Sequence, residues 1–82
     1  MPKEIKVYTR TTCAPCKMLK MWLSRKNLPF SEVNVDDNEN AMDDVVRLSG
    51  YSMVPCTVVT LKDDSQKIIS GYNLNQLSTV VQ

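Results

Sequence analysis

The chain contains 82 residues with a formal net charge of +1, of which 43% are hydrophobic and 23% charged. This length predicts one small domain over residues 1–82, and the nearly balanced charge with few aromatic residues argues against nucleic-acid binding. No run approaches the roughly 20 apolar residues of a membrane span, and the first residues lack the apolar core of a signal peptide. We therefore expect a cytoplasmic, monomeric protein without membrane contact.

The first predicted strand is the alternating run Ile5–Tyr8. A helix is expected over Ala14–Lys26, because its apolar residues recur with the spacing of one helical face. The segment Asn27-Leu28-Pro29 ends that helix, since proline cannot continue it. The next strand is predicted over Phe30–Val35, although Ser31-Glu32 interrupts its alternation.

Three polar residues, Asp36–Asn38, are expected to cap a second helix over Glu39–Leu48, which Gly50 ends. The β-branched run Cys56–Leu61 predicts a strand. After a short polar turn, the segment Gln66–Ser70 returns as its hairpin partner.

Asn73 is expected to cap a last helix, with Gln76 as its capping-box partner. The predicted element order is therefore βαβαββα. Because a helix joins the first two strands, they should form a parallel pair with a right-handed crossover, and the hairpin adds an antiparallel pair. The predicted fold class is α/β, with a four-stranded mixed sheet flanked by helices.

Two cysteines, Cys13 and Cys16, stand where the first strand gives way to the first helix. Unpaired backbone N–H groups and the positive end of the helix dipole favour a thiolate there, and the thiolate is the reactive form. Pro15 fits the first turn, which does not need its missing N–H. Cys13 should be open to solvent, whereas Cys16 shares the apolar face and should point inward. This arrangement suits attack by Cys13 and resolution by Cys16.

The cysteine pair has two alternative interpretations. A structural zinc site usually takes four ligands, and this chain has three cysteines and no histidine, so no metal site is predicted. Inert thiols are the second alternative. The third cysteine, Cys56, is either a small buried hydrophobic residue or an oxidation-sensitive thiol. In a reducing cytoplasm the order of strand, CxxC and helix favours redox chemistry.

The charges are unevenly distributed. Residues 1–26 hold seven Lys or Arg and one Glu, whereas the remainder holds three Lys or Arg and eight Asp or Glu. The cysteine pair lies in the basic part, which favours a thiolate and an acidic partner. A solvated helix face is the alternative for every charge except Arg10 and Lys17.

Three segments, Val7–Cys16, Met53-Val54-Pro55 and Ser70-Gly71-Tyr72, together resemble the glutaredoxin branch of the thioredoxin superfamily. The resemblance covers nearly the whole chain and implies a thioredoxin-like, glutaredoxin-type fold. It also implies that Pro55 has a cis peptide bond, although X–Pro bonds are cis in only about 5% of cases in folded proteins. The backbone of Val54 would then pair with an extended substrate segment.

Within this branch, the Cys-Ala-Pro-Cys motif and the single glycine at Gly71 differ from glutathione-using dithiol glutaredoxins. Ser70-Gly71-Tyr72 and Thr9-Arg10 look more like NrdH redoxins, which carry electrons to class Ib ribonucleotide reductase and are recharged by thioredoxin reductase, although those usually have Val-Gln between the cysteines. Glutathione remains the alternative reductant, because Arg10 stands where glutaredoxins place a basic residue that meets the glycyl carboxylate of glutathione.

The resemblance thus implies a thiol-disulfide oxidoreductase with Cys13 as nucleophile, Cys16 as resolving cysteine and Pro55 beside them. It needs no bound cofactor beyond a redox-active Cys13–Cys16 disulfide, recharged by thioredoxin reductase with NADPH or by glutathione. Its partner would be a disulfide-containing protein such as ribonucleotide reductase. The residues expected to stabilise the thiolate or bind substrate are Arg10, Thr12, Lys17, Val54, Gly71 and Tyr72. An iron–sulfur module and a noncatalytic docking domain remain as alternatives.

Overall fold

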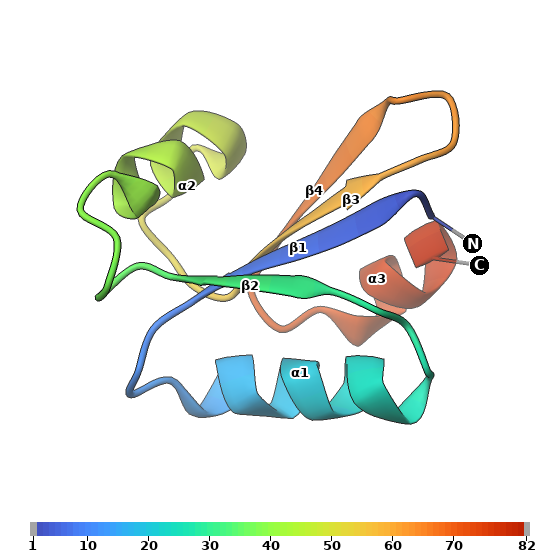
Figure 1. Cartoon of the computed structure of the whole chain (residues 1–82), viewed down its shortest axis with the longest axis horizontal. Coiled ribbons are helices and arrows are strands. Elements are labelled where there is room, and N and C mark those ends of the chain that lie inside the picture. The colour runs from blue at the N-terminus through green and yellow to red at the C-terminus, as the bar shows by residue number, and fades with distance from the viewer. Residues whose placement is uncertain (1, 82) are drawn as a thin grey trace.

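The computed structural model describes residues 2–81 and contains seven helices and strands (Figure 1). In chain order these are β1 (Glu4–Thr9), α1 (Ala14–Arg25), β2 (Ser31–Asn34), α2 (Ala41–Ser49), β3 (Cys56–Thr60), β4 (Gln66–Ser70) and α3 (Leu74–Val81). The predicted order βαβαββα is confirmed.

The four strands form one mixed sheet in the order β2-β1-β3-β4. Strand β1 pairs in parallel with β2 and antiparallel with β3, and β3 pairs antiparallel with β4, as predicted. The register places Tyr8 opposite Cys56, and Cys56 opposite Ser70. The end of β1, the start of β3 and the end of β4 therefore meet at one edge of the sheet, next to the start of α1.

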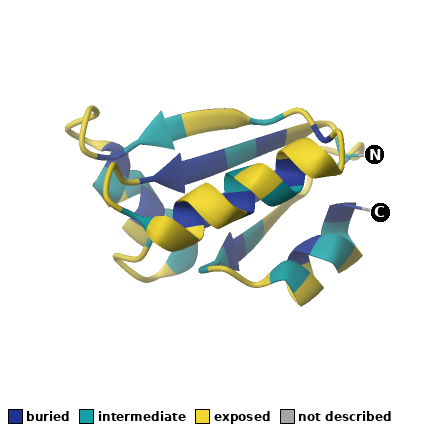
Figure 2. Cartoon of the chain, turned by 90° about the horizontal axis from the view of Figure 1, so that it is seen from below, coloured by how far each residue is buried: buried dark blue, intermediate teal, exposed yellow. Residues whose placement is uncertain are grey.

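Helices α1 and α3 cover one face of the sheet and α2 covers the other (Figure 1). Alternate residues of β1 supply the two faces, because successive side chains of a strand point to opposite sides. Ile5 and Val7 pack with the α1 and α3 side chains, whereas Tyr8 packs with Val45 of α2. The buried residues of α1 form one stripe toward the sheet, and exposed residues cover its outer side (Figure 2).

The predicted start of α2 was wrong. The helix begins at Ala41 rather than Glu39, and its N-cap residue Asn40 makes no side-chain capping bond. Two of the three residues expected to cap it, Asp36 and Asn38, make hydrogen bonds elsewhere. Asp36 accepts a hydrogen bond from the backbone N–H of Thr11 at 3.0 Å, and Asn38 donates to the backbone oxygen of Asn34 at 3.0 Å. These local hydrogen bonds compete with helix capping, and α2 has no side-chain cap.

The other boundaries agree with the predictions to within one residue, and both ends of β4 agree fully. The helix α1 ends at Arg25, β1 begins at Glu4 and β2 spans only Ser31–Asn34. Gly50 ends α2 as predicted, with a φ of 82° that favours glycine. Within residues 2–81, none of the helices has the length and apolar character needed to cross a bilayer.

Candidate redox site

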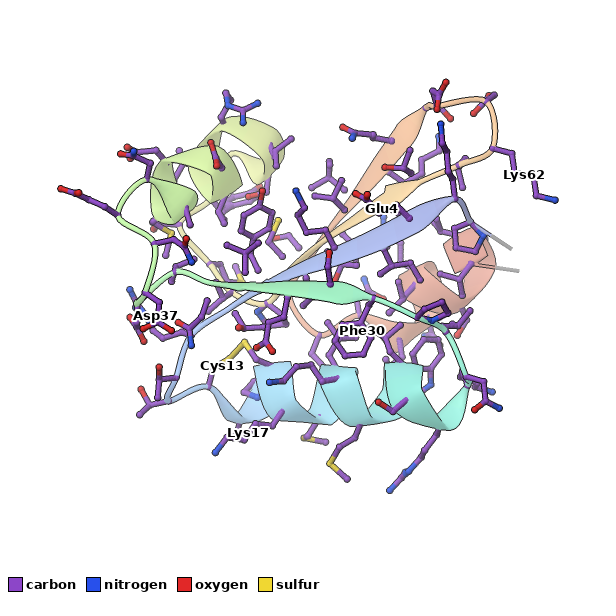
Figure 3. The ribbon with its side chains drawn as sticks, in the orientation of Figure 1. Glu4, Cys13, Lys17, Phe30, Asp37 and Lys62 are labelled. Carbon is purple, nitrogen blue, oxygen red and sulfur yellow. A yellow bond between two sulfur atoms is a disulfide. The ribbon has the colours of Figure 1, made fainter. Side chains whose placement is uncertain are left out.

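The cysteine pair occupies the N-terminus of α1 (Figure 3). Cys13 is the N-cap residue, with extended backbone, and it is joined to Cys16 by a disulfide with a Cα–Cα distance of 5.3 Å. Cys16 is 1% exposed, so the prediction that it points inward is confirmed. Cys13 is half-buried, which leaves its sulfur partly accessible, although less open than predicted.

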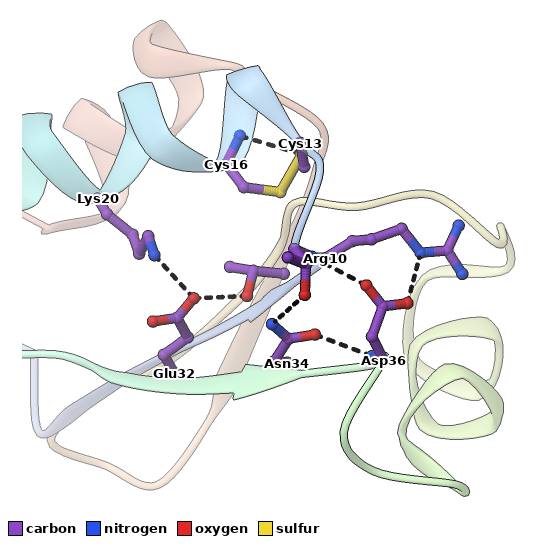
Figure 4. The surroundings of a disulfide bond; sticks show 9 residues. Arg10, Cys13, Cys16, Lys20, Glu32, Asn34 and Asp36 are labelled. Atoms are coloured by element: carbon purple, nitrogen blue, oxygen red, sulfur yellow. Dashed lines mark hydrogen bonds and ion pairs between the residues drawn. A yellow bond between two sulfur atoms is a disulfide. The ribbon is translucent and has the colours of Figure 1, made fainter.

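The backbone N–H of Cys16 donates to the sulfur of Cys13 at 3.2 Å, as a capping side chain accepts from the first helical turn (Figure 4). The same N–H and the helix dipole are available to a Cys13 thiolate after reduction. The first turn contains no acidic residue that would oppose this charge, and Pro15 lies where an N–H is not needed. The geometry therefore favours the charged form of Cys13 over that of Cys16.

The Val54-Pro55 peptide bond is cis, as the resemblance implied. The carbonyl oxygen of Pro55 accepts a hydrogen bond from the N–H of Gly71 at 2.8 Å, so the segment before β3 and the segment after β4 lie together. Gly71 has a φ of 79°, which a side chain would strain. Val54 is half-buried and Tyr72 is exposed. The role predicted for these residues in substrate binding stays a prediction.

The side chain of Arg10 pairs with Asp36, a residue predicted to cap the second helix. Its Nε lies 3.2 Å from the Oδ1 of Asp36, whose other oxygen accepts from the Thr11 N–H (Figure 4). The pKa of Asp36 is lowered, first by that backbone hydrogen bond and also by Arg10. The positive charge of Arg10 is therefore partly balanced by the Asp36 carboxylate and does not act on the sulfurs alone.

A second polar cluster, which sequence reasoning missed, joins β1, β2 and α1. The Oε2 of Glu32 accepts hydrogen bonds from the hydroxyl of Thr9 at 2.6 Å and from the ammonium of Lys20 at 2.9 Å (Figure 4). These bonds, the Thr9 bond above all, lower the pKa of Glu32. Glu32 and Lys20 line the same hollow as Cys16. The interrupted alternation at Glu32 was the one signal in the sequence that pointed to this cluster.

We predict that Glu32→Gln lowers stability at neutral pH and that this loss shrinks in acid. The folded pKa of Glu32 is depressed, so its contribution is complete above the ordinary glutamate pKa of about 4.3 and is lost as the pH falls through the lower folded pKa. Because the side chain is 33% exposed, we expect a loss of only about 0.5–1 kcal/mol.

Urea denaturation of the wild type and of Glu32→Gln, in steps from pH 7 to pH 3, measures this difference. Glu39→Gln is the matched control, because Glu39 is exposed in the loop before α2. A difference that stayed constant over the whole range would show that the variant loses packing rather than charge.

The structure locates two more of the predicted residues, Lys17 and Thr12, whose role at the site stays a prediction. The side chain of Lys17 points outward from α1, whereas the disulfide lies on the side of the helix that faces the sheet (Figure 3). Its backbone N–H donates to the carbonyl oxygen of Cys13 at 3.2 Å, which fixes the first turn. Thr12 is exposed in the loop before the motif. Neither the Lys17 ammonium nor the Thr12 hydroxyl makes a hydrogen bond to a sulfur among residues 2–81.

Cys56 is a free, fully buried thiol on the face of the sheet that packs against α2. Burial raises the pKa of this thiol, which opposes reactivity at neutral pH. Its place fits the interpretation as a small hydrophobic core residue. Among residues 2–81, no three side chains of His, Cys, Asp or Glu are grouped so as to hold a metal ion.

Comparison with known proteins places these features in a wider group. Residues 5–62 match the glutaredoxin family model. The chain is 32% identical over 74 residues to the glutaredoxin-like protein NrdH of Lactococcus lactis, which covers 90% of this chain and 94% of that protein. It is 33% identical over 78 residues to a glutaredoxin-like 8.6 kDa protein of Clostridium pasteurianum, covering 95% of this chain and 97% of that protein.

The fold has close counterparts among solved structures. The glutaredoxin from Archaeoglobus fulgidus superposes with a TM-score of 0.82 at 25% sequence identity, covering 100% of this chain and 88% of that one. The predicted thioredoxin-like architecture, with its four-stranded mixed sheet and three helices, is confirmed.

Proposed function

The chain belongs to the glutaredoxin family, whose members are thiol redox proteins, and from this we propose that it reduces protein disulfides through the Cys13–Cys16 pair. The observation that carries the proposal is the asymmetry of the two sulfurs. Cys13 is partly accessible and accepts an N–H at the start of α1, whereas Cys16 is 1% exposed. An accessible thiolate beside a sheltered thiol is what sequential exchange requires.

The proposed reaction has two exchange steps. The Cys13 thiolate attacks one sulfur of the substrate disulfide, forms a mixed disulfide and releases the first substrate thiolate. Cys16 then loses its proton and attacks the Cys13 sulfur, which restores the Cys13–Cys16 disulfide and releases the second substrate thiolate. Both electrons that pass to the substrate come from the two cysteine sulfurs, and the proposed reaction therefore needs no bound cofactor. Pro55 would shape the neighbouring surface, and the backbone of Val54 would pair with the substrate segment.

We further propose that the protein is an NrdH-type carrier, recharged by thioredoxin reductase with NADPH and serving ribonucleotide reductase in the cytoplasm. The similarity to the Lactococcus lactis NrdH supports this subgroup. The pairing of Arg10 with Asp36 also supports it, because the glycyl carboxylate of glutathione would have to compete with Asp36 for that guanidinium.

Recharging of the oxidised protein tests the subgroup. With thioredoxin reductase and NADPH we expect turnover at least about tenfold faster than with glutathione, glutathione reductase and NADPH, which corresponds to about 1.4 kcal/mol in the barrier. NADPH absorbance follows both reactions under one set of conditions. Faster recharging by glutathione would replace the NrdH assignment with a glutathione-dependent glutaredoxin and leave the dithiol chemistry in place.

A further inference from the structure

The outer side of α1 is an exposed face that carries both methionine and basic side chains. It consists of Lys17, Met18, Met21, Ser24 and Arg25, which follow helical spacing and lie opposite the buried stripe of the helix. Met18 and Met21 are 51% and 53% exposed. Figure 2 shows exposed residues along the outer side of α1, the helix that Cys13 caps. This outer α1 face begins at Lys17, within about one helical turn of Cys13 along the helix axis.

The charge of this face is not balanced within the protein. The segment 14–25 has no acidic residue. Lys20, at the edge of the face, pairs with Glu32, but Lys17 and Arg25 have no ion pair among residues 2–81. The helix α2 provides a contrast, because its Arg47 pairs with Asp44 one turn away, at 3.1 Å. The outer α1 face therefore presents uncompensated positive charge.

The two methionines give the face an apolar component. A flexible, polarisable thioether side chain adapts to differently shaped partners and is common on binding surfaces. A face that was only solvated would be expected to carry polar or charged residues at both positions. Acidic and apolar side chains together are the complement of this surface.

We propose that the outer α1 face binds an acidic, apolar segment of the protein whose disulfide is reduced. The inference rests on the function proposed above and specifies the chemistry of the partner. The 12 residues of α1 span about 18 Å. An extended segment covers that length with about six residues. Carboxylates within about six residues of the partner's reactive cysteine would therefore reach Arg25.

Two synthetic peptide disulfides test the inference. Each is a symmetric dimer joined through a central cysteine, with arms of about six alternating residues on both sides. One peptide alternates Glu and Leu, and the other alternates Lys and Leu. Quenched-flow rates with the reduced protein should favour the acidic peptide about tenfold at low ionic strength, and added salt should largely remove the difference.

Arg25→Glu should lower the rate with the acidic peptide about fivefold and raise that with the basic peptide. Lys62→Glu makes the same change in net charge at the turn between β3 and β4, far from α1 (Figure 3), and should leave the ratio of the two rates near the wild-type value. Met21→Ser should slow both leucine-containing peptides about threefold. Arg25→Gln removes the charge without reversing it, so its ratio of acidic to basic peptide rates should lie between those of the wild type and Arg25→Glu. Circular dichroism verifies that each variant is folded.

Hydroxyethyl disulfide, which is small and uncharged, separates the two proposals. Wild type, Arg25→Glu and Met21→Ser should reduce it at equal rates. If the wild type reduces it but does not distinguish the peptides, or if Arg25→Glu and Lys62→Glu change the ratio equally, the docking surface is refuted and the proposed function remains. If the wild type does not reduce it, the proposed function and the docking inference both fall.

Discussion

Cys13→Ser is expected to abolish disulfide reduction, with a loss of at least about 10³-fold in turnover. A serine hydroxyl remains protonated at neutral pH, so the variant lacks the nucleophile that begins the exchange. The hydrogen bond from the Cys16 N–H and the dipole of α1 lower the cost of a charge at position 13, but they act on a thiol and not on an alcohol of much higher pKa. Turnover of hydroxyethyl disulfide measures the effect.

Cys16→Ser provides the matched control, because it removes the other sulfur and leaves the nucleophile. This variant should still attack the substrate, since Cys13 keeps its place at the start of α1. It should then stop as a mixed disulfide, because the buried position that completes the exchange no longer carries a thiol. Intact-protein mass spectrometry detects the adduct. Full turnover by Cys13→Ser, or an adduct located on Cys16 in the wild type, would contradict the proposed roles.

The redox pair was predictable from local rules. A thiol that follows a strand and precedes an apolar-periodic segment must lie near a helix N-terminus, and the position of Cys16 on the periodic face places it inside. Pro55 was not predictable in this way, because local energetics favour a trans bond. Its cis geometry was expected only from the resemblance of three separate segments to one family.

The polar residues around the pair could not be assigned from the sequence alone. From its position in the sequence, Asp36 is predicted to cap a helix. Instead it binds the loop that contains Arg10 and Thr11, because the parallel pairing of β1 and β2 brings that loop close to it. Glu32 is likewise predicted to be an exposed strand residue. In the structure, Lys20 of α1 forms a hydrogen bond to it, because the crossover packs α1 beside β2. Contacts between residues more than ten positions apart depend on the folded topology, which no local pattern encodes.

Leu23→Ala is expected to lower the free energy of unfolding by about 2–5 kcal/mol. Leu23 is fully buried on the inner side of α1 and belongs to the cluster that also contains Val7 of β1 and Leu77 of α3. Its truncation removes apolar contacts with the sheet and leaves a cavity that the surrounding strands fill only partly. A domain of this size has a total stability of about 5–15 kcal/mol, so the loss is a large part of it. Urea denaturation followed by circular dichroism measures the change.

Met21→Ala is the control on the same helix, since Met21 is 53% exposed and its truncation should change stability by less than about 0.5 kcal/mol. The comparison also tests how the redox site is held. Because α1 contacts the sheet through Leu19 and Leu23 but carries Cys16 in its first turn, loosening the helix should raise the exposure of the Cys16 thiol in the reduced protein. Faster alkylation of Cys16 in Leu23→Ala than in Met21→Ala would show this. Equal alkylation rates, with the stability loss present, would mean that the first turn is held by its own capping bonds instead.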